Sequence, residues 1–473
     1  MKNRTMCLPG FSNVMRKSRA HTGARAALKE AQSVDGLAAL VARFIPTELF
    51  KAKPGSRTRM FTPMITFTAF LGQVMDRGSS CREAVRKVQS WFLASGHEAP
   101  TGNNSAYCQA RTRLDLDLLR KAFESLCTWF EEKAKPSDLW YGREVKVVDS
   151  TGISMPDTSE NRSAFEYAGN QKPGCGFPTG KLLGVFSLAT GHLQRFVHGN
   201  WKEHDMGMIR SVIGWINEGD IMVADRGFCG WGVMALLVRK RVDVVIRLHQ
   251  RRAISNHLTS WDKPQRQGAW SQALWDELPA SLSLRMVRYK VEEPGFRTKE
   301  VILVTTLTNK KTYPDEAIIE LYGRRWQVEL NLRDIKTTLG LDILRSKSPD
   351  LIFKEIYMQA IAYNIVRGVM LKTSRQAQRP LYRLSFKGTV DTLRQWTVLF
   401  GNTDSKTIQS RWEDLLLALA CDLVPERPGR SEPRAVKRRP KVYQKLTTAR
   451  RLMVVSKSRR IKNKPKASKT TLS

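Results

Sequence analysis

A chain of 473 residues with 41% hydrophobic content is long enough for two or three domains with a real core, which argues against global disorder. Its formal net charge of +35 and pI near 10.2 predict a polyanionic partner, nucleic acid first and an anionic membrane second. The sequence has no apolar run of about 20 residues and its N-terminus is interrupted by basic residues, so we expect a soluble, unexported protein with no membrane partner.

Cysteine and histidine give little sign of a metal site. The seven cysteines are scattered without a C-x-x-C pair, which is typical of reduced thiols in a cytoplasmic protein. The seven histidines are scattered as well. One acidic cluster with a histidine, Glu203-His204-Asp205, has ligands that suit a metal, but a loop or the start of a helix explains it more simply.

The first part of the chain is basic and then helical. Residues 1–58 form a basic arm that contains one modest helix at 36–45. Residues 59–138 form a helical domain, in which Ser80 and Glu83 have capping-box spacing. Its predicted helices are 64–75, 81–94, 105–114 and 116–133.

Two arginines on the third of these helices suggest DNA binding. Arg111 and Arg113 would lie on a helix of a helix-turn-helix-like reader, since short helices joined by tight turns are typical of that motif. A plain helical bundle with a basic surface explains the same pattern. The sequence leaves both interpretations open.

From residue 139 short apolar runs alternate with turns and helices, which indicates an α/β core whose first part is 139–248. Its strand-like runs are 145–150, a hairpin over 181–199 through Thr190-Gly191, 220–227 and 242–248. Helices are predicted at 208–219 and 230–240. Residues 249–311 carry further strand-like runs and are predicted to be a β-rich insertion into that core.

The remaining segments are predicted to be helical and then basic. Residues 312–345 are the last part of the core and carry its acidic helix, and 346–425 form a C-terminal helical region with a buried helix at 350–372. The tail, 426–473, has seventeen Lys or Arg from Arg427 onward against one acid, Glu432. Such a tail is typically disordered and seeks polyanions without a sequence preference.

Two aspartates follow predicted strands. Asp149 ends the run "VKVVD" and Asp225 ends "IMVAD". The ends of strands are where open α/β sheets gather ligands, although an aspartate there is often only a turn or a helix cap. If the two strands are neighbours in one sheet, the carboxylates lie together.

A third acid comes from "ELYGRRWQVELNLRDIK", residues 320–336. At about 100° per residue, Tyr322, Arg325, Glu329 and Lys336 fall within roughly 60° of one another on a helix. A separate apolar stripe would hold this helix against the core, and it consists of Leu321, Val328, Leu332, Ile335 and Leu339. A solvated face with an Arg325–Glu329 ion pair is the simpler alternative.

Asp149, Asp225 and Glu329 would together form a set of hard oxygen ligands. Such a set without His or Cys suits Mg²⁺ or Mn²⁺, and two such ions support phosphoryl transfer. Arg325 and Lys336 then supply positive charge for a phosphate, and Tyr322 supplies a hydrogen-bond donor. Trp326 is placed to stack on an unpaired base, although a core aromatic is the simpler interpretation.

These residues resemble a known signature. The spacing Tyr322-x2-Arg325-x3-Glu329-x6-Lys336 resembles the Y-R-E-K signature of the bacterial insertion-sequence DDE transposases of family four. "VVDSTG" around Asp149 and "VADRGF" around Asp225 look like the first and second acidic positions of that family. The stretches "TPMITFTAFLGQVMDRGSSCREAV" and "RPGRSEPRAVKRRPK" are also similar to segments of these enzymes, so the likeness covers most of the chain.

The resemblance implies an RNase H-like catalytic core with a β-rich insertion, a helical N-terminal DNA-binding region, and a helical and basic C-terminal region. It implies cut-and-paste DNA transposition with Mg²⁺ or Mn²⁺, two ions held by Asp149, Asp225 and Glu329, while Tyr322, Arg325 and Lys336 contact DNA phosphates. The implied partners are the terminal inverted repeats of the element, target DNA and a second copy of the chain in a synaptic complex. The implied location is the cytoplasm of a bacterium, at the nucleoid, and a hairpin intermediate is a feature of relatives.

Three alternatives stay open from the sequence. An RNase H-like nuclease or resolvase that cuts without joining would use the same acids, and only Tyr322, Arg325 and Lys336 speak against it. A noncatalytic DNA-binding protein would carry the acids for structure alone. A protein that binds membrane surfaces through its tail would require affinity for liposomes.

Overall fold

The computed structural model describes residues 33–51, 59–94, 96–167, 175–200, 205–248, 260–266, 270–290, 300–401 and 404–426. Most of the basic arm and nearly all of the tail therefore lie outside the described residues. So does the predicted metal alternative at Glu203 and His204, of which only Asp205 is described, as the first residue of a helix.

Helices make up the N-terminal part of the described chain, as the sequence predicts. They are α2 (Ser33–Val41), α3 (Pro63–Met75), α4 (Cys81–Ala94), α5 (Ser105–Arg113) and α6 (Leu116–Lys133), with short 3-10 turns at Thr47–Phe50 and Pro136–Asp138. Thr62 caps α3 by accepting a hydrogen bond from the backbone N–H of Ile65. At the start of α4 the Ser80 hydroxyl accepts from the Glu83 N–H at 3.1 Å, which accounts for the capping spacing in the sequence.

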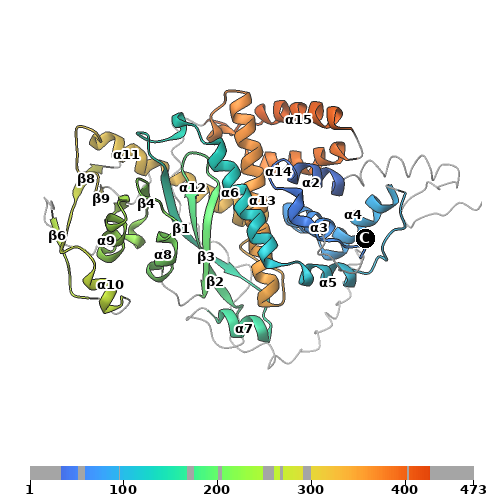
Figure 1. Cartoon of the computed structure of the whole chain (residues 1–473), viewed down its shortest axis with the longest axis horizontal. Helices are drawn as coiled ribbons and strands as arrows, with labels where there is room; N and C mark the ends of the chain where they lie inside the picture. Colours follow the sequence, from blue (N-terminus) through green and yellow to red (C-terminus); the bar gives the residue numbers. More distant parts are fainter. Residues whose placement is uncertain are drawn as a thin grey trace, which may run out of the picture.

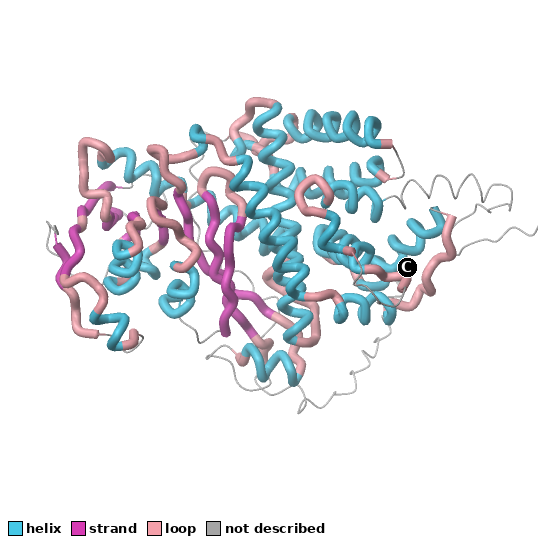
Figure 2. Tube along the Cα trace, viewed as in Figure 1, coloured by secondary structure: helices cyan, strands magenta, loops and turns pink. Residues whose placement is uncertain are grey.

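A seven-stranded mixed sheet, in the order β3-β2-β1-β4-β5-β9-β8, extends from one end of the molecule, at β8, to its middle, at β2 and β3 (Figures 1 and 2). Its strands are β1 (Val145–Ser154), β2 (Thr179–Ser187), β3 (Leu193–Asn200), β4 (Ile221–Ala224), β5 (Asp243–Arg247), β8 (Arg285–Lys290) and β9 (Glu300–Thr305). The predicted hairpin through Thr190-Gly191 is confirmed as β2–β3, and Gly191 adopts a positive φ of 68°.

Strand directions define the fold class. β1, β2 and β3 pair antiparallel, whereas β1, β4 and β5 pair parallel. Helix α8 (Asp205–Ile213) precedes β4, and α9 (Trp231–Arg239) joins β4 to β5. Three antiparallel strands followed by two parallel ones, with helices on both faces, make this the RNase H-like α/β arrangement expected from the sequence.

The segment predicted as an insertion differs from that expectation in part. β9 pairs antiparallel with β5, and β8 pairs with β9, so both strands extend the central sheet. Only a small two-stranded sheet stands apart, β6 (Ser260–Asp262) with β7 (Ser281–Ser283), next to helix α10 (Gln272–Asp276). The burial of β9 gives the reason, because its consecutive apolar residues Leu303 and Val304 are buried on opposite faces of the sheet.

Two apolar clusters cover the two faces of the sheet. Val147 and Val223 belong to the cluster that also contains residues of α6, α12 and α13, while the next residues, Val148 and Ala224, belong to the cluster with α8 and α9. This alternation is what the period of two in a strand requires. The first cluster continues without interruption into α2 and α3, so the end of the predicted basic arm is part of the core.

From Asp315 onward the described chain is mostly helical. Its helices are α11 (Asp315–Arg324), α12 (Trp326–Arg333), a π-helix (Asp334–Leu339), α13 (Pro349–Gln376), α14 (Phe386–Trp396) and α15 (Ser405–Ala420). The predicted burial of the 350–372 helix is confirmed in α13, which runs beside α6 through the middle of the molecule (Figure 1). In the described ranges we find no helix with the length and apolar character needed to cross a membrane.

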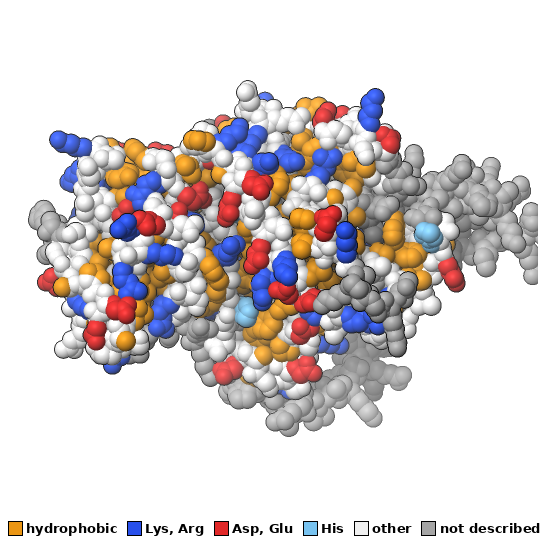
Figure 3. Space-filling view, viewed as in Figure 1, with side chains coloured by type: hydrophobic (Ala, Val, Ile, Leu, Met, Phe, Trp, Pro, Cys, Tyr) orange, Lys and Arg blue, Asp and Glu red, His pale blue; other side chains and the backbone are white. Residues whose placement is uncertain are grey.

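Charge on the described surface is mixed. In the view of Figure 3, Lys and Arg side chains are interspersed with Asp and Glu. A large share of the net charge of +35 comes from the tail, where residues from Arg427 to the end carry seventeen basic side chains and one acid. On the described part, a polyanion would therefore be bound by particular basic groups rather than by a uniform field.

Candidate active site

Asp149 lies on the sheet face that α12 covers. The strand does not end at Asp149 as predicted, because β1 continues to Ser154 through its pairing with β2. What ends there is the parallel pairing with β4, whose last pair is Val148 with Ala224. Since Val147 faces the α12 side and Val148 the other, strand alternation turns Asp149 toward α12.

Asp225 follows β4 directly and lies beside Asp149. The predicted adjacency of the two strands is confirmed by the parallel β1–β4 pair, and the step after Val148 and Ala224 brings the two aspartates next to each other. Asp225 caps a 3-10 turn, Arg226–Phe228, and accepts a hydrogen bond from the Gly227 N–H at 2.8 Å. A Cβ atom at position 227 would lie 3.0 Å from the Asp225 carboxylate, which explains the glycine in "ADRGF".

Glu329 comes from α12, which packs against β1. The predicted apolar stripe is confirmed, because all five of its members are buried: Leu321, Val328, Leu332, Ile335 and Leu339. Arg325 lies between the acids. Its Nη2 donates to Glu329 Oε1 at 2.6 Å, and its Nη1 is 4.0 Å from Asp149 Oδ2.

The predicted single helix over 320–336 is wrong in its details. A turn at Arg325 separates α11 from α12, and α12 continues into the π-helix that contains Lys336. A π-helix has more residues per turn than an α-helix, so the wheel that placed Lys336 beside Tyr322 does not apply there. Lys336 is half-buried, and the described structure gives no contact between it and the three acids.

The charges of this group influence one another. Burial raises the pKa of Asp149, the nearby carboxylates of Asp225 and Glu329 add to this rise, and the Ser150 N–H and Arg325 oppose it; together these effects bring the pKa to about 6. Burial alone would lower the pKa of Arg325, but Tyr322, Glu329 and Asp149 outweigh it and raise that pKa. Arg325 is therefore the counter-ion of the acidic group.

The donor chemistry of the three acids fits a divalent metal. All are carboxylates, and the mutual repulsion that raises the Asp149 pKa is what a bound cation would relieve. In the arrangement described, however, Glu329 is bonded to Arg325, and no three His, Cys, Asp or Glu side chains of the described residues lie close enough to hold an ion. The guanidinium of Arg325 provides the positive charge in this arrangement.

Tyr322 and Arg247, which the sequence analysis missed, complete the site. Tyr322 is buried, and the Cζ atom of Arg325 lies 5.6 Å from the centre of its ring. Arg247 follows Ile246, the partner of Ala224 in β5, and therefore lies beside Asp225; its charge acts on the pKa of Tyr322 and of Tyr289. The only signal for Arg247 in the sequence is its position at the end of the run "VDVVIR".

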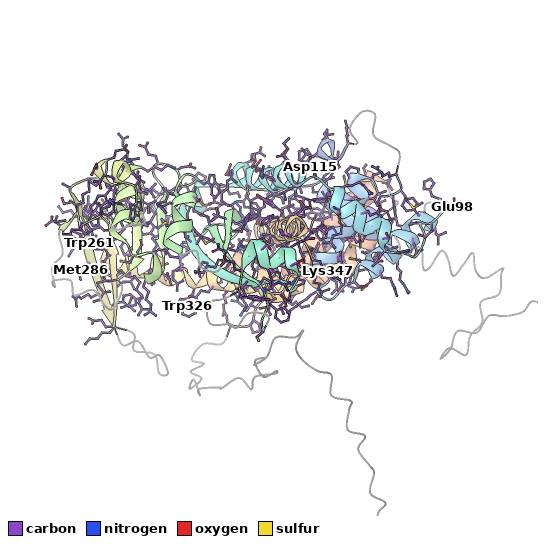
Figure 4. All side chains as sticks on the ribbon, turned by 90° about the horizontal axis from the view of Figure 1, so that it is seen from below. Glu98, Asp115, Trp261, Met286, Trp326 and Lys347 are labelled. Atoms are coloured by element: carbon purple, nitrogen blue, oxygen red, sulfur yellow. The ribbon has the colours of Figure 1, made fainter. Side chains whose placement is uncertain are left out.

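Three other predicted residues lie apart from this group. Trp326 is 49% exposed, so the simpler interpretation as a core aromatic is wrong; Figure 4 labels it at the surface. Arg111 is buried, with its guanidinium above the ring of Phe70 at 4.0 Å, so it serves packing in the described structure. Arg113, at the end of α5, is exposed.

Comparison with known proteins gives the family. Residues 140–365 match the family described as "Transposase DDE domain". The chain is 26% identical to the transposase InsG for insertion sequence element IS4 of Escherichia coli (strain K12) over 390 residues, which are 79% of this chain and 84% of that protein. It is 24% identical over 314 residues to a protein of Synechocystis sp. (strain ATCC 27184 / PCC 6803 / Kazusa) named for insertion sequence element IS4SA, and the match covers 64% of this chain and 80% of that protein.

Among solved structures, a piggyBac transposase in a synaptic complex with hairpin DNA is similar with a TM-score of 0.41 and 12% identity, over 87% of each chain. The family match spans all three acids, Asp149, Asp225 and Glu329. Residues 140–365 therefore carry a transposase DDE domain, and over most of its length the chain is similar to transposases of IS4 insertion sequence elements.

Proposed function

We propose that this transposase holds two Mg²⁺ or Mn²⁺ ions with Asp149, Asp225 and Glu329, and cuts and joins DNA at the ends of its element. The observation that carries the proposal is the meeting of two neighbouring parallel strands with α12, through Arg325. Asp149, Asp225 and Glu329 would hold these ions, which would supply Lewis-acid activation of a water or a 3′ hydroxyl and stabilisation of the leaving oxygen. The chain itself aligns the phosphodiester with the acids.

Arg325 is the residue that connects metal and DNA in this proposal. Its Nε atom is buried and has no hydrogen-bond partner among the described residues, so a donor is available beside the two that contact Asp149 and Glu329. A phosphate oxygen is the acceptor that suits a guanidinium best. We assign Arg325 to the scissile region of the DNA, where binding of phosphate would release Glu329 toward the ions.

The other predicted contacts take supporting roles. The hydroxyl of Tyr322 donates to a phosphate oxygen next to Arg325. Lys336, in the π-helix that follows α12, supplies positive charge for a DNA phosphate. Trp326, exposed at the start of α12, stacks on an unpaired base. Terminal inverted repeats and target DNA are the substrates, and a homodimer in a synaptic complex brings two element ends together.

The test is a cleavage assay with the full chain, a duplex that carries an element end, and Mg²⁺. Glu329→Gln keeps the size of the side chain and removes its charge, so cleavage should fall at least about 100-fold while DNA is still bound. Glu320→Gln is the matched control, because Glu320 is an exposed acid on α11. Equal cleavage by both variants would remove Glu329 from the active site.

The same assay separates transposase from nuclease chemistry. Adding target plasmid asks whether the cut 3′ end is joined to a second DNA. Joined product from the wild type supports strand transfer, whereas cutting without joining would support the nuclease alternative. DNA binding without any cutting by the wild type would contradict the proposed catalytic role of all three acids.

A further inference from the structure

A cavity of about 360 Å³ lies at the junction of the N-terminal helices with the segment that follows the π-helix. It is formed by the end of α3, the start of α4, the side of α5 and the loop before α13. Figure 1 shows α3, α4 and α5 grouped beside α13. None of the roles described above uses this cavity.

The floor of the cavity carries a buried arginine. Arg111 is 9% exposed; its Nη2 donates to the hydroxyl of Ser346 at 3.2 Å, and its Nη1 lies 3.4 Å from the sulfur of Cys81. Its Nε atom has no partner among the described residues. A guanidinium that is buried with a donor unused is costly unless an acceptor binds it.

The rim carries two more arginines, both exposed. Arg345 donates to the backbone oxygen of Ser79 at 3.0 Å, and Arg77 lies 3.7 Å from Asp342 and donates to the backbone oxygen of Thr337. The one acid of the lining, Glu355, already accepts hydrogen bonds from the backbone N–H groups of residues 345 and 346. The cavity is therefore positively charged overall.

Two further features favour an oxyanion. The hydroxyl of Ser79 is buried at the cavity without a hydrogen-bond partner among the described residues. Helix α4, which has 14 residues, begins at the same wall, so the positive end of its dipole is directed at the cavity. Unpaired donors of Ser79 and Arg111 together with this helix end make a site for a phosphate group.

We infer that this cavity binds a backbone phosphate of the element DNA, next to the segment that carries Lys336. Thr337, whose backbone oxygen accepts a hydrogen bond from Arg77, directly follows Lys336, so a strand bound by Lys336 can continue to the rim. Lys347, two residues beyond Arg345, is exposed and lies on the lower side of the molecule with Trp326 in Figure 4. The inference rests on DNA binding by this chain, but not on the roles of the three acids.

The test measures the salt dependence of binding between the full chain and an element-end duplex. The double variant Arg77→Gln/Arg345→Gln removes charge only at the exposed rim, and it should lower the slope of log K against log salt by about 1, as loss of one phosphate contact predicts. Arg379→Gln is the matched control, an exposed arginine away from the cavity, and should leave the slope unchanged.

A second variant adds charge instead of removing contacts. Ile343 lines the rim and is 61% exposed, so Ile343→Glu should weaken DNA binding without harm to folding. Leu417→Glu, on α15, is its control, since Leu417 is 58% exposed far from the cavity lining. Unchanged DNA binding and slope in both cavity variants would overturn the inference.

Two further measurements distinguish free phosphate from DNA phosphate as the ligand, and failure of this inference from failure of the proposed function. If inorganic phosphate raises the melting temperature of the DNA-free wild type but not of the double variant, while the DNA slope is unchanged, the site takes free phosphate and the assignment to DNA is overturned. A neutral methylphosphonate at one position of the duplex should weaken wild-type binding and have no effect on the double variant. A wild type that binds no element DNA at all would overturn the proposed function and this inference with it. If the wild type binds element DNA and the cavity variants show unchanged salt slopes, only the phosphate-binding role of the cavity is overturned.

Discussion

Two arginines of this molecule are buried to nearly the same extent and have opposite surroundings. Arg325 is 8% exposed and lies between the carboxylates of Asp149 and Glu329, whereas Arg111 is 9% exposed and contacts a hydroxyl, a thiol and the ring of Phe70. The first is a charge within an ionic network. The second is a charge held by neutral groups at the edge of a cavity.

The different neighbours of the two arginines decide whether a DNA phosphate must displace an existing partner in order to bind. Arg325 has carboxylates as counter-ions, so a phosphate must compete with Glu329 for its donors. Arg111 contacts no carboxylate among the residues that the structure describes, so a phosphate adds a partner without displacing one. We expect the active site to depend strongly on pH and metal, and the cavity to depend mainly on salt.

The largest expected effect comes from Arg325→Met, which keeps much of the side-chain volume and removes the charge. The acids lose their counter-ion, and the free energy of unfolding should fall by about 1–3 kcal/mol at pH 8, a range that allows for the partial exposure of Glu329. At pH 5 Asp149, whose pKa is about 6, is mostly protonated, which relieves part of the repulsion, so the deficit should shrink. Urea denaturation at both pH values measures it, and an equal deficit at pH 5 and 8 would contradict the ionic network.

Asp149→Asn tests the same network from the acid. The pKa of Asp149 is about 6 in the folded chain against 3.8 for an ordinary aspartate, so the folded state binds more protons than the unfolded state between these values. The stability of the wild type should therefore fall as pH rises from about 4 to about 6, by up to about 2 kcal/mol, and stay lower above that range.

The variant lacks this titration, so its stability curve should be flatter across the same range. Urea midpoints at closely spaced pH values between 4 and 7 measure the difference. A wild-type stability that rises through this window would mean that Arg325, rather than burial, dominates the pKa of Asp149.

Arg111→Met tests whether the contribution of the second arginine to stability is independent of pH. It removes a contact with the Phe70 ring and a hydrogen bond to Ser346, so we expect a loss of about 1–2 kcal/mol. The contacts of Arg111 are a ring, a hydroxyl and a thiol, so the loss should be the same at pH 5 and pH 8. A deficit that grows with pH would mean that Arg111 also neutralises an acid.

The sequence predicts the parts of this molecule that follow from local patterns. The runs around Val147 and Val223 are apolar on consecutive residues because these strands are buried on both faces, and that pattern reveals parallel strands and the acids that follow them. The buried stripe of α12 follows from helical periodicity in the same way.

Other features depend on long-range pairing or on hydrogen-bond register, which a pattern of residue types does not contain. The sequence does not give the register of the β4–β5 pair, and so it cannot place Arg247 beside Asp225. The turn at Arg325 and the π-helix around Lys336 change the helical hydrogen-bond register, while the apolar residues from Leu321 to Leu339 stay buried across both. The burial of Arg111 results from a contact between α5 and the loop before α13, 235 residues away in sequence at Ser346.

The smallest expected effect on stability comes from Trp326→Ala, although Trp326 adjoins Arg325. Its side chain is 49% exposed, so the free energy of unfolding should change by no more than about 0.5 kcal/mol. If the indole stacks on an unpaired base, binding to an element end with an unpaired terminal base should weaken by about 1–3 kcal/mol, and binding to a fully paired duplex should not. Fluorescence anisotropy with the two DNAs makes the comparison, and equal losses on both would mean that Trp326 contacts the backbone and reads no base. Since neither arginine of the comparison recognises a base, a loss confined to the unpaired end would make Trp326 the residue that senses the opening of the duplex beside the active site.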